Sequence, residues 1–367
     1  MKILFCLGSL NKGGAERVVS NLSNEFVKRN NEVSIITTIK CMKPAYELNK
    51  EIKIYSLDKN SLDKNLKIKN IINKNIKRIL KLRSILNKEK PDIILTFLPE
   101  PTYRVMLLNI FKKRKVIISV RNDPNIEYNN YIKKFLVRLL YTKADGFVFQ
   151  TIDAQKWFSK KIQNKSVIIY NPINPEFICN PYDKERENKI VSVGRLAEQK
   201  NHKLLIDAFN TIKDEIPNYK IYIYGDGPLK EWLIDYVSKL NLSNKIIFAG
   251  TVDNIKKEIY KSKIFVLTSN YEGLPNSLIE AMALGVPCIS TNCKIGGPKE
   301  LFDNDNNGLL VNLNDANDLA QKIMRIIHDD SLSQRLSING NKKCKEMSIE
   351  IIAQKWIDYI KKISGVL

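Results

Sequence analysis

The stretch Tyr271–Pro287 reads Y-E-G-L-P-N-S-L-I-E-A-M-A-L-G-V-P and carries the strongest fold signal in the chain. The apolar run Ile264–Thr268 before it is typical of a buried parallel strand. Ser277–Leu284 is rich in Leu, Ala, Met and Glu and therefore predicts a helix. Either Asn276 or Ser277 can cap that helix. A strand, a loop and a helix in this order are the repeating unit of a doubly wound parallel sheet.

Two carboxylates occupy defined places in this unit. Glu272 lies in the loop at the carboxyl end of the strand, where open α/β sheets bind ligands. Glu280 lies about one turn inside the helix and can face the same crevice. The first N–H groups of the helix lack partners and favour an anion. The alternative is a pair of surface carboxylates that only balance charge, but the G-L-P-N loop between strand and helix favours a ligand site.

The same alternation runs along the whole chain. Strands are expected at Ile3–Leu7, Glu32–Thr38, Lys53–Leu57, Ile93–Phe97, Val116–Val120, Gly146–Gln150, Val167–Tyr170, Ile190–Val193, Lys220–Tyr224, Ile246–Ala249, Ile264–Leu267, Pro287–Ser290 and Leu309–Leu313. Helices are expected at Ala15–Arg29, Tyr131–Tyr141, His202–Ile212, Leu229–Leu240, Val252–Tyr260, Ser277–Leu284 and Ile349–Ile363. The pattern and the length of 367 residues predict two α/β domains with doubly wound parallel sheets, joined by a candidate linker at 171–175.

Charge is distributed unevenly. The net charge is +21, and residues 1–175 hold 34 Lys and Arg against 14 Asp and Glu. Leu62–Lys90 alone contains ten basic residues, and Lys112–Lys115 adds a second basic cluster. Nucleic acid and anionic membranes both attract such a surface. Within Leu62–Lys90, an apolar stripe at helical spacing predicts one face on the core; its members are Ile68, Ile72, Ile76, Ile79 and Leu86.

Several classes of protein are disfavoured. The six cysteines form no C-x-x-C pair and there are two histidines, which argues against a zinc site, a disulfide framework and a His-based triad. No apolar run reaches the roughly 18 residues of a membrane span. Met1–Gly8 reads as a first core strand and not as a signal peptide, so a cytoplasmic protein is expected. The D-x-D sequence Asp303–Asp305 stands in turn chemistry, and no metal is expected there.

The Glu272–Glu280 segment resembles the donor-sugar motif of the retaining glycosyltransferases of family 4, of the bacterial surface-polysaccharide type, which have the GT-B fold. The resemblance implies that Glu272 contacts the donor sugar and Glu280 the ribose hydroxyls. The donor-binding residues that it implies are Gly14, Gly194, Gly273, Leu274, Pro275, Asn276 and Glu280. Arg195 and Lys200 follow the strand Ile190–Val193, and in the family the matching cations clamp the donor diphosphate.

The acceptor side departs from the family pattern. Many members carry a His after the strand that matches Val116–Val120, whereas this chain has Arg121-Asn122-Asp123-Pro124. Asp123 is a candidate to orient or deprotonate an acceptor hydroxyl, and Arg121 to bind an acceptor phosphate. An Asp-Pro turn beside a solvated Arg is an equally good interpretation. In the family, the segment G-G-A-E-R, here Gly13–Arg17, lines both substrate sites, which makes Glu16 a candidate for acceptor binding. Arg121 and Asn122 of the R-N-D-P segment are the other candidates for acceptor binding.

The resemblance implies an acceptor domain at 1–172, with a C-terminal helix at 350–367 packing back on it, and a nucleotide-sugar domain at 173–349. The expected function is retaining transfer of a hexose or N-acetylhexosamine from a nucleotide sugar, a UDP-sugar for preference. The expected acceptor is a lipid-linked or other glycan in capsule, exopolysaccharide or lipopolysaccharide synthesis. No cofactor is expected. The predicted location is peripheral, at an anionic membrane surface on the inner face of the bacterial plasma membrane.

Two alternatives stay open at this point. The first is another GT-B enzyme, such as a nucleotide-sugar epimerase, although this does not explain the basic first half. The second is a basic membrane- or nucleic-acid-binding protein. The charge is not interleaved with aromatic residues in a known nucleic-acid-binding pattern, so no nucleic-acid partner is expected.

Overall fold

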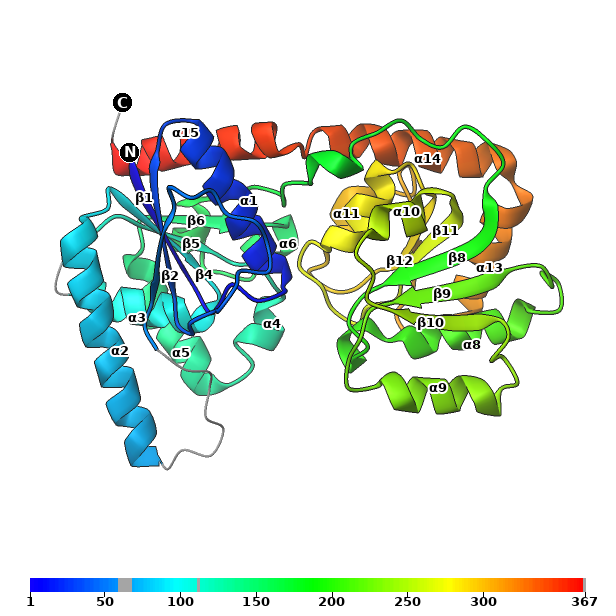
Figure 1. Ribbon diagram of the computed structural model, residues 1–367, viewed down its shortest axis with the longest axis horizontal. Helices are drawn as coiled ribbons and strands as arrows, with labels where there is room; N and C mark the ends of the chain where they lie inside the picture. Colours follow the sequence, from blue (N-terminus) through cyan, green and yellow to red (C-terminus); the bar gives the residue numbers. More distant parts are fainter. Residues whose placement is uncertain (59–67, 111–112, 366–367) are drawn as a thin grey trace. The chain divides into compact units, whose positions relative to one another are not determined.

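The computed structural model describes residues 1–58, 68–110 and 113–365. The chain divides into two compact units, which are described separately. Unit 1 comprises Met1–Pro172 and the C-terminal segment that begins at Ile349, and unit 2 comprises Ile173–Ser348. Figure 1 shows a sheet flanked by helices in each unit. Part of the basic segment Leu62–Lys90, and Lys112 of the second basic cluster, lie outside the described residues.

Unit 1 contains a seven-stranded parallel sheet with the strand order β3-β2-β1-β4-β5-β6-β7. Its strands are β1 (Lys2–Leu7), β2 (Glu32–Thr37), β3 (Lys53–Ser56), β4 (Ile93–Phe97), β5 (Val116–Ser119), β6 (Gly146–Phe149) and β7 (Ser166–Ile168). The middle strands read as continuous apolar runs because both faces of the sheet are covered by helices. Ile3 pairs with Val33 on one side and with Ile93 on the other.

The helices of unit 1 cover the two faces of this sheet. They are α1 (Gly14–Lys28), α2 (Ile68–Glu89), α3 (Pro99–Asn109), α4 (Pro124–Glu127), α5 (Tyr131–Leu140), α6 (Ile152–Lys156), α7 (Lys160–Gln163) and α15 (Ile349–Ser364). Helix α3 packs against both α2 and α5, and α1 packs against α15. Right-handed crossovers place α2, α3 and α5 on one face, since each moves the chain toward β7.

Helix α15 belongs to unit 1 through buried contacts. The Trp356 side chain is fully buried, and its ring centroid lies 6.0 Å from that of Phe97. The hydroxyl of Tyr359 accepts a hydrogen bond of 3.0 Å from the backbone N–H of Phe147. A C-terminal helix therefore completes the core of the first unit although unit 2 separates them in sequence.

Unit 2 contains a six-stranded parallel sheet with the order β10-β9-β8-β11-β12-β13. Its strands are β8 (Glu187–Val193), β9 (Lys220–Tyr224), β10 (Ile246–Gly250), β11 (Ser262–Leu267), β12 (Cys288–Thr291) and β13 (Leu309–Val311). Its helices are α8 (His202–Ile212), α9 (Lys230–Lys239), α10 (Ile255–Tyr260), α11 (Asn276–Ala283), α12 (Gly297–Phe302), α13 (Ala316–His328) and α14 (Asp330–Lys345). β8 pairs with β11, so the loops after these two strands lie at the same edge of the sheet.

The expected fold class is confirmed, but some local predictions are wrong. Helices α3, α13 and α14 are missing from the predictions, and α10 begins at Ile255 and not at Val252. In α2, Ile76 is exposed, while the buried apolar face is formed by Leu82, Ile85 and Leu86. Among residues 1–58, 68–110 and 113–365, no helix has the length and apolar character that crossing a membrane requires.

Candidate functional site

The loops after β8 and β11 bring Lys200 and Glu272 together. The Nζ atom of Lys200 donates to Oε1 of Glu272 and forms an ion pair with it. The hydroxyl of Ser269 donates to the same oxygen at 2.7 Å. Both partners are mostly buried, with 17% of the Lys200 side chain and 9% of the Glu272 side chain exposed. The two candidate residues therefore form one desolvated pair at the carboxyl edge of the sheet.

Hydrogen bonds to backbone carbonyls hold these two loops in register. The Thr268 hydroxyl donates to the carbonyl of Lys200 at 2.9 Å, and the N–H of Asn270 donates to the carbonyl of Gln199 at 2.8 Å. Loop residues fixed by such bonds present their side chains with little conformational freedom. The pair of Lys200 and Glu272 is thus preorganised by its surroundings.

Two glycines allow the backbone to pass beneath Lys200. A Cβ atom on Gly194 would lie 3.2 Å from the aliphatic carbons of Lys200, so the lysine side chain packs directly over this residue. Gly225 has φ +135°, and a Cβ atom there would lie 2.0 Å from the carbonyl oxygen of Gly194. The loop after β9 therefore packs directly against the backbone of the Gly194 turn, which gives the Gly225-Asp226-Gly227 segment a structural role.

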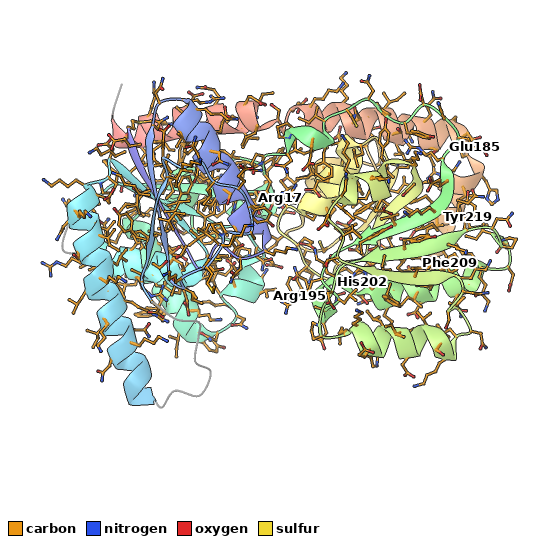
Figure 2. The ribbon with its side chains drawn as sticks, in the orientation of Figure 1. Arg17, Glu185, Arg195, His202, Phe209 and Tyr219 are labelled. Carbon is orange, nitrogen blue, oxygen red and sulfur yellow. The ribbon has the colours of Figure 1, made fainter. Side chains whose placement is uncertain are left out.

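Arg195 extends from the same turn into solvent. Its neighbour Leu196 is fully buried and anchors the loop. The guanidinium of Arg195 makes no hydrogen bond or ion pair with any residue that the structure describes. Figure 2 shows Arg195 and His202 at the same end of the unit-2 sheet. An unpaired guanidinium beside Lys200 suits the two oxygens of a phosphate group.

Helix α11 begins without a side-chain cap, so the prediction that Asn276 or Ser277 caps it is wrong. The residue at the N-cap position is Pro275, which makes no side-chain cap hydrogen bond. The first N–H groups of the helix have no intrahelical partner and favour an anion. Glu280 lies in the second turn and is 5% exposed.

The loop between Glu272 and α11 is supported by the start of α12. The N–H of Gly297 donates to the carbonyl of Gly273 at 2.7 Å. A Cβ atom on Gly297 would lie 2.7 Å from that oxygen and 2.8 Å from the Cα atom of Leu274. Residues Gly273, Leu274, Pro275 and Asn276 are thus held beside Glu272, in the place where the sequence predicts donor contacts.

His202 lies at the start of α8, close in sequence to Lys200. Burial, together with the nearby charge of Lys200, lowers the pKa of its imidazole to about 4. Its Nδ1 atom lies 3.4 Å from the hydroxyl of Ser192. The imidazole is therefore neutral at physiological pH and packs against β8 without adding a third cation beside Arg195 and Lys200.

In unit 1, the start of α1 carries its own carboxylate. The helix begins at Gly14, with Gly13 at the N-cap position. The Glu16 carboxylate folds back so closely that a Cβ atom on Gly13 would lie 2.2 Å from Oε2 of Glu16. Burial raises the pKa of Glu16. The predicted donor residue Gly14 and acceptor residue Glu16 are therefore adjacent at an N-terminus that favours anions.

Arg121 follows β5 and is partly buried, and its terminal guanidinium nitrogens have no hydrogen-bond partner. Its guanidinium carbon lies 5.0 Å from the ring centroid of Phe97. Both terminal nitrogens are buried and have no hydrogen-bond partner. Burial lowers the pKa of Arg121 to about 9, so the group still carries its charge at neutral pH. The interpretation of Arg121 as a solvated surface residue is wrong.

Asp123 caps the short helix α4. Its Oδ1 atom accepts from the backbone N–H of Asn125 at 2.8 Å and from the Asn125 amide at 3.0 Å. The side chain is buried, with 4% exposed. The Asp-Pro turn interpretation is thus confirmed for its geometry, and one carboxylate oxygen is engaged in the turn. The neighbouring Asn122 is partly buried.

Comparison with known proteins identifies the chain. A family model described as Glycosyltransferase Family 4 matches residues 12–177, and one described as Glycosyl transferases group 1 matches residues 176–343. A Campylobacter jejuni relative is 30% identical over 371 residues, with 100% of this chain and 99% of the relative covered. The chain belongs to glycosyltransferase family 4. That relative is the GalNAc-alpha-(1->4)-GalNAc-alpha-(1->3)-diNAcBac-PP-undecaprenol alpha-1,4-N-acetyl-D-galactosaminyltransferase.

Two further proteins resemble this family 4 glycosyltransferase. The amylovoran biosynthesis glycosyltransferase AmsD of Erwinia amylovora is 25% identical over 361 residues, with 96% of this chain and 97% of AmsD covered. The structure of Anabaena HepE in complex with UDP matches with a TM-score of 0.81 at 16% identity, covering 99% of this chain and 100% of HepE. The latter likeness supports the GT-B fold, with its two Rossmann-like domains.

Glu127, at the end of α4, was not identified from the sequence of this glycosyltransferase. Burial, with a smaller contribution from the charge of Asp123, raises its pKa to about 7. The sequence feature that could have revealed Glu127 is its spacing from Asp123 in D-P-N-I-E. The two carboxylates are four residues apart, so two like charges lie about one helical turn from each other. A carboxyl that titrates near neutral pH beside the acceptor candidates is a further candidate for proton transfer.

Replacing Glu127 with Gln is expected to change how stability depends on pH. The pKa of Glu127 is about 7 in the folded protein against 4.5 for an ordinary Glu, so the folded state binds the proton more tightly. Stability should fall as pH rises from about 4.5 to about 7, and Glu127→Gln should be more stable than wild type by about 1–3 kcal/mol near pH 8. Urea denaturation between about pH 4.5 and 8 measures this difference. A difference that stays constant across that range would contradict the prediction, and Glu51→Gln, at an exposed position, is the control.

No metal ligand set is found in the described part of the chain. Within it, no group of three or more His, Cys, Asp and Glu residues is placed to hold a metal ion. The D-x-D sequence forms a turn, since Asp303, Asn304 and Asp305 have φ values of 44°, 52° and 64°. Its Asp305 carboxylate accepts from the N–H of Leu310 at 3.1 Å and so serves the turn itself.

Proposed function

We propose that this family 4 glycosyltransferase transfers an N-acetylhexosamine or hexose from a UDP-sugar, with retention, to a lipid-linked glycan in surface-polysaccharide synthesis. The observation that carries the proposal is the Lys200–Glu272 pair at the carboxyl edge of the unit-2 sheet, with Arg195 in the loop after β8 and Glu280 in the helix that follows the Glu272 loop. Two cations can bind a diphosphate there, and two carboxylates can accept from sugar hydroxyls. The UDP complex of HepE and the N-acetylgalactosaminyl transfer named for the C. jejuni relative support the donor class.

The Lys200–Glu272 pair indicates how the donor would engage. Without a ligand, each charge neutralises the other in a largely buried setting. A donor diphosphate would share the Lys200 ammonium with Glu272. The Arg195 guanidinium would donate two parallel hydrogen bonds to the phosphate oxygens. Glu272, still held by Ser269, then presents its other oxygen to a sugar hydroxyl. Glu280 would accept from the ribose, as the family resemblance implies.

Transfer would proceed on the face of the sugar from which the diphosphate departs. The bond between the anomeric carbon and the diphosphate oxygen breaks as the acceptor oxygen bonds to that carbon. The acceptor proton passes to the departing phosphate oxygen, so no protein nucleophile is needed. Negative charge grows on the leaving diphosphate, and Arg195 and Lys200 stabilise it at that stage. This is the interaction that should most affect turnover.

The acceptor class is supported by Arg121. A buried, unpaired guanidinium is costly unless a ligand supplies the missing anion. The C. jejuni relative is named for a diphosphate-linked undecaprenol acceptor, which offers such an anion. We therefore assign a phosphate group of the acceptor to Arg121. Asn122 and Glu16 are the other residues that the sequence predicts for acceptor binding. A lipid-linked acceptor would also require a peripheral location at the inner membrane surface.

A nucleotide-sugar panel tests the proposal. Thermal shift and slow donor hydrolysis would be measured for UDP-, GDP- and ADP-sugars, with Glu280→Ala and Lys200→Ala as site variants. The matched control is Lys203→Ala, which removes an exposed lysine three residues away whose partner is Asp207. We expect one UDP-sugar to stabilise the wild type and Lys203→Ala but neither site variant. A response to no nucleotide sugar would refute the transferase assignment, and conversion of the sugar without any acceptor would favour an epimerase.

A further inference from the structure

Helix α5 of unit 1 presents large apolar side chains to solvent. The exposed fractions are 92% for Tyr131, 73% for Ile132, 64% for Phe135 and 51% for Leu139. Tyr131, Phe135 and Leu139 are spaced by four residues and therefore lie along one face of the helix. The opposite face is packed, since Val137 and Leu140 are buried. Contiguous apolar surface of this kind indicates an interaction site, unlike single exposed apolar residues.

The surroundings of this stripe are basic. Helix α5 contains Lys133, Lys134 and Arg138 and no acidic residue. The neighbouring helix α3, which packs against α5, adds exposed Leu107. On its other side α3 packs against α2, whose described part carries exposed basic side chains and two exposed apolar ones; these are Lys77, Lys81, Arg83, Lys88, Ile76 and Leu80.

We propose that α5 is the membrane-docking element of this chain and lies in the interface of an anionic bilayer, with Ile132, Phe135 and Leu139 among the acyl chains. An apolar face flanked by Lys and Arg is the pattern that inserts to the depth of the headgroup boundary. Basic residues near an anionic surface add electrostatic attraction to this insertion. Lys134 and Arg138 flank the stripe and would meet the phosphate groups of the lipids.

A second copy of the chain fits this surface less well. A symmetric dimer through α5 would bring the three cations of one copy against the same three of the other, and like charges across an interface are costly. An anionic bilayer pairs with both the apolar stripe and the charge. The inference rests on the proposed lipid-linked acceptor for its biological role, but binding of α5 to lipid requires no donor and no catalysis.

Vesicle flotation of the full chain tests the docking. The vesicles would contain phosphatidylcholine alone or phosphatidylcholine mixed with phosphatidylglycerol. The variant Ile132→Ser/Phe135→Ser/Leu139→Ser should lose at least about tenfold in binding to the anionic vesicles, because three apolar side chains no longer insert. The variant Lys134→Gln/Arg138→Gln should lose binding to anionic vesicles more than to neutral ones. The matched control, Trp232→Ser/Ile234→Ser, removes exposed apolar side chains from α9 of unit 2 and should bind as wild type does.

A second variant keeps the test independent of folding defects. In Phe135→Trp, the indole emission should shift to shorter wavelength when anionic vesicles are added. Absence of this shift, or equal flotation of the triple Ser variant and wild type, would overturn the proposal. A wild-type dimer that the triple variant dissociates would overturn it in favour of self-association. Failure of the UDP-sugar panel with flotation intact would refute the proposed function alone.

Discussion

Replacing Lys200 with alanine is expected to reduce kcat by about 10²–10³-fold, because the leaving diphosphate loses a cation that acts as its charge develops. The effect on stability should also be large. Glu272 has 9% of its side chain exposed, and without Lys200 its charge would remain in that setting with only the Ser269 hydroxyl and solvent to offset it. Breaking a buried pair by removing one partner costs about 3–5 kcal/mol, and the 17% exposure of Lys200 places this pair toward the lower end.

The double variant Lys200→Ala/Glu272→Gln separates the two effects. Removing both charges takes away the unpaired carboxylate, so most of the lost stability should return. Turnover should not return, because the double variant lacks both the Lys200 cation that binds the diphosphate and the Glu272 carboxylate that accepts hydrogen bonds from the sugar. Urea denaturation and steady-state kinetics on the same samples measure both. If the double variant regained activity together with stability, Lys200 would be a structural residue and the proposed donor site would be wrong.

The pairing of Lys200 with Glu272 could be only partly predicted from the sequence. The sequence places Lys200 after one strand and Glu272 after another, each on the ligand side of its own strand. That they form a pair depends on β8 lying beside β11, with β9 and β10 on the far side of β8. Strand order is a long-range property that local patterns do not encode. The interaction spans 72 residues, and only the assembled sheet reveals it.

In unit 1, local sequence patterns likewise did not predict which face of helix α5 is buried or which role Asp123 has. The segment Tyr131–Tyr141 predicts a helix, but apolar residues occur on both of its faces, so periodicity does not tell which face is packed. Val137 and Leu140 are buried, while Phe135 and Leu139 face solvent. At Asp123 the sequence left two interpretations open, because a capping carboxylate and a catalytic one are the same residue type after the same strand. Hydrogen bonds from Asn125 reveal the capping geometry.

Arg121 provides the second large expected effect, and here stability and function should change in opposite directions. Its terminal nitrogens are buried without a partner, and the group is still charged at neutral pH since its pKa is about 9. Burying an uncompensated charge destabilises the folded state. Arg121→Met keeps the aliphatic contact with the Phe97 ring and removes the charge. The variant should therefore be more stable than wild type by about 1–3 kcal/mol.

Activity should fall in the same variant. If Arg121 binds a phosphate of the acceptor, Arg121→Met should lose about 10²-fold in kcat/KM for a diphosphate-linked acceptor, consistent with the loss of about 1.5–3 kcal/mol for a hydrogen bond to a charged group. Donor hydrolysis should be unchanged, and a glycan acceptor without phosphate should show little difference between variant and wild type. Arg121→Lys should keep part of the activity, because a point charge replaces the fork.

The combination of outcomes distinguishes a binding residue from a structural one. A structural arginine would lose stability and activity together on substitution, and the loss would be the same for acceptors with and without phosphate. A gain in stability with a loss confined to phosphate-bearing acceptors has one explanation: the folded chain maintains an unfavourable buried charge that the substrate neutralises. That result would place the acceptor phosphate beside Phe97 and Arg121, at the carboxyl end of β4 and β5.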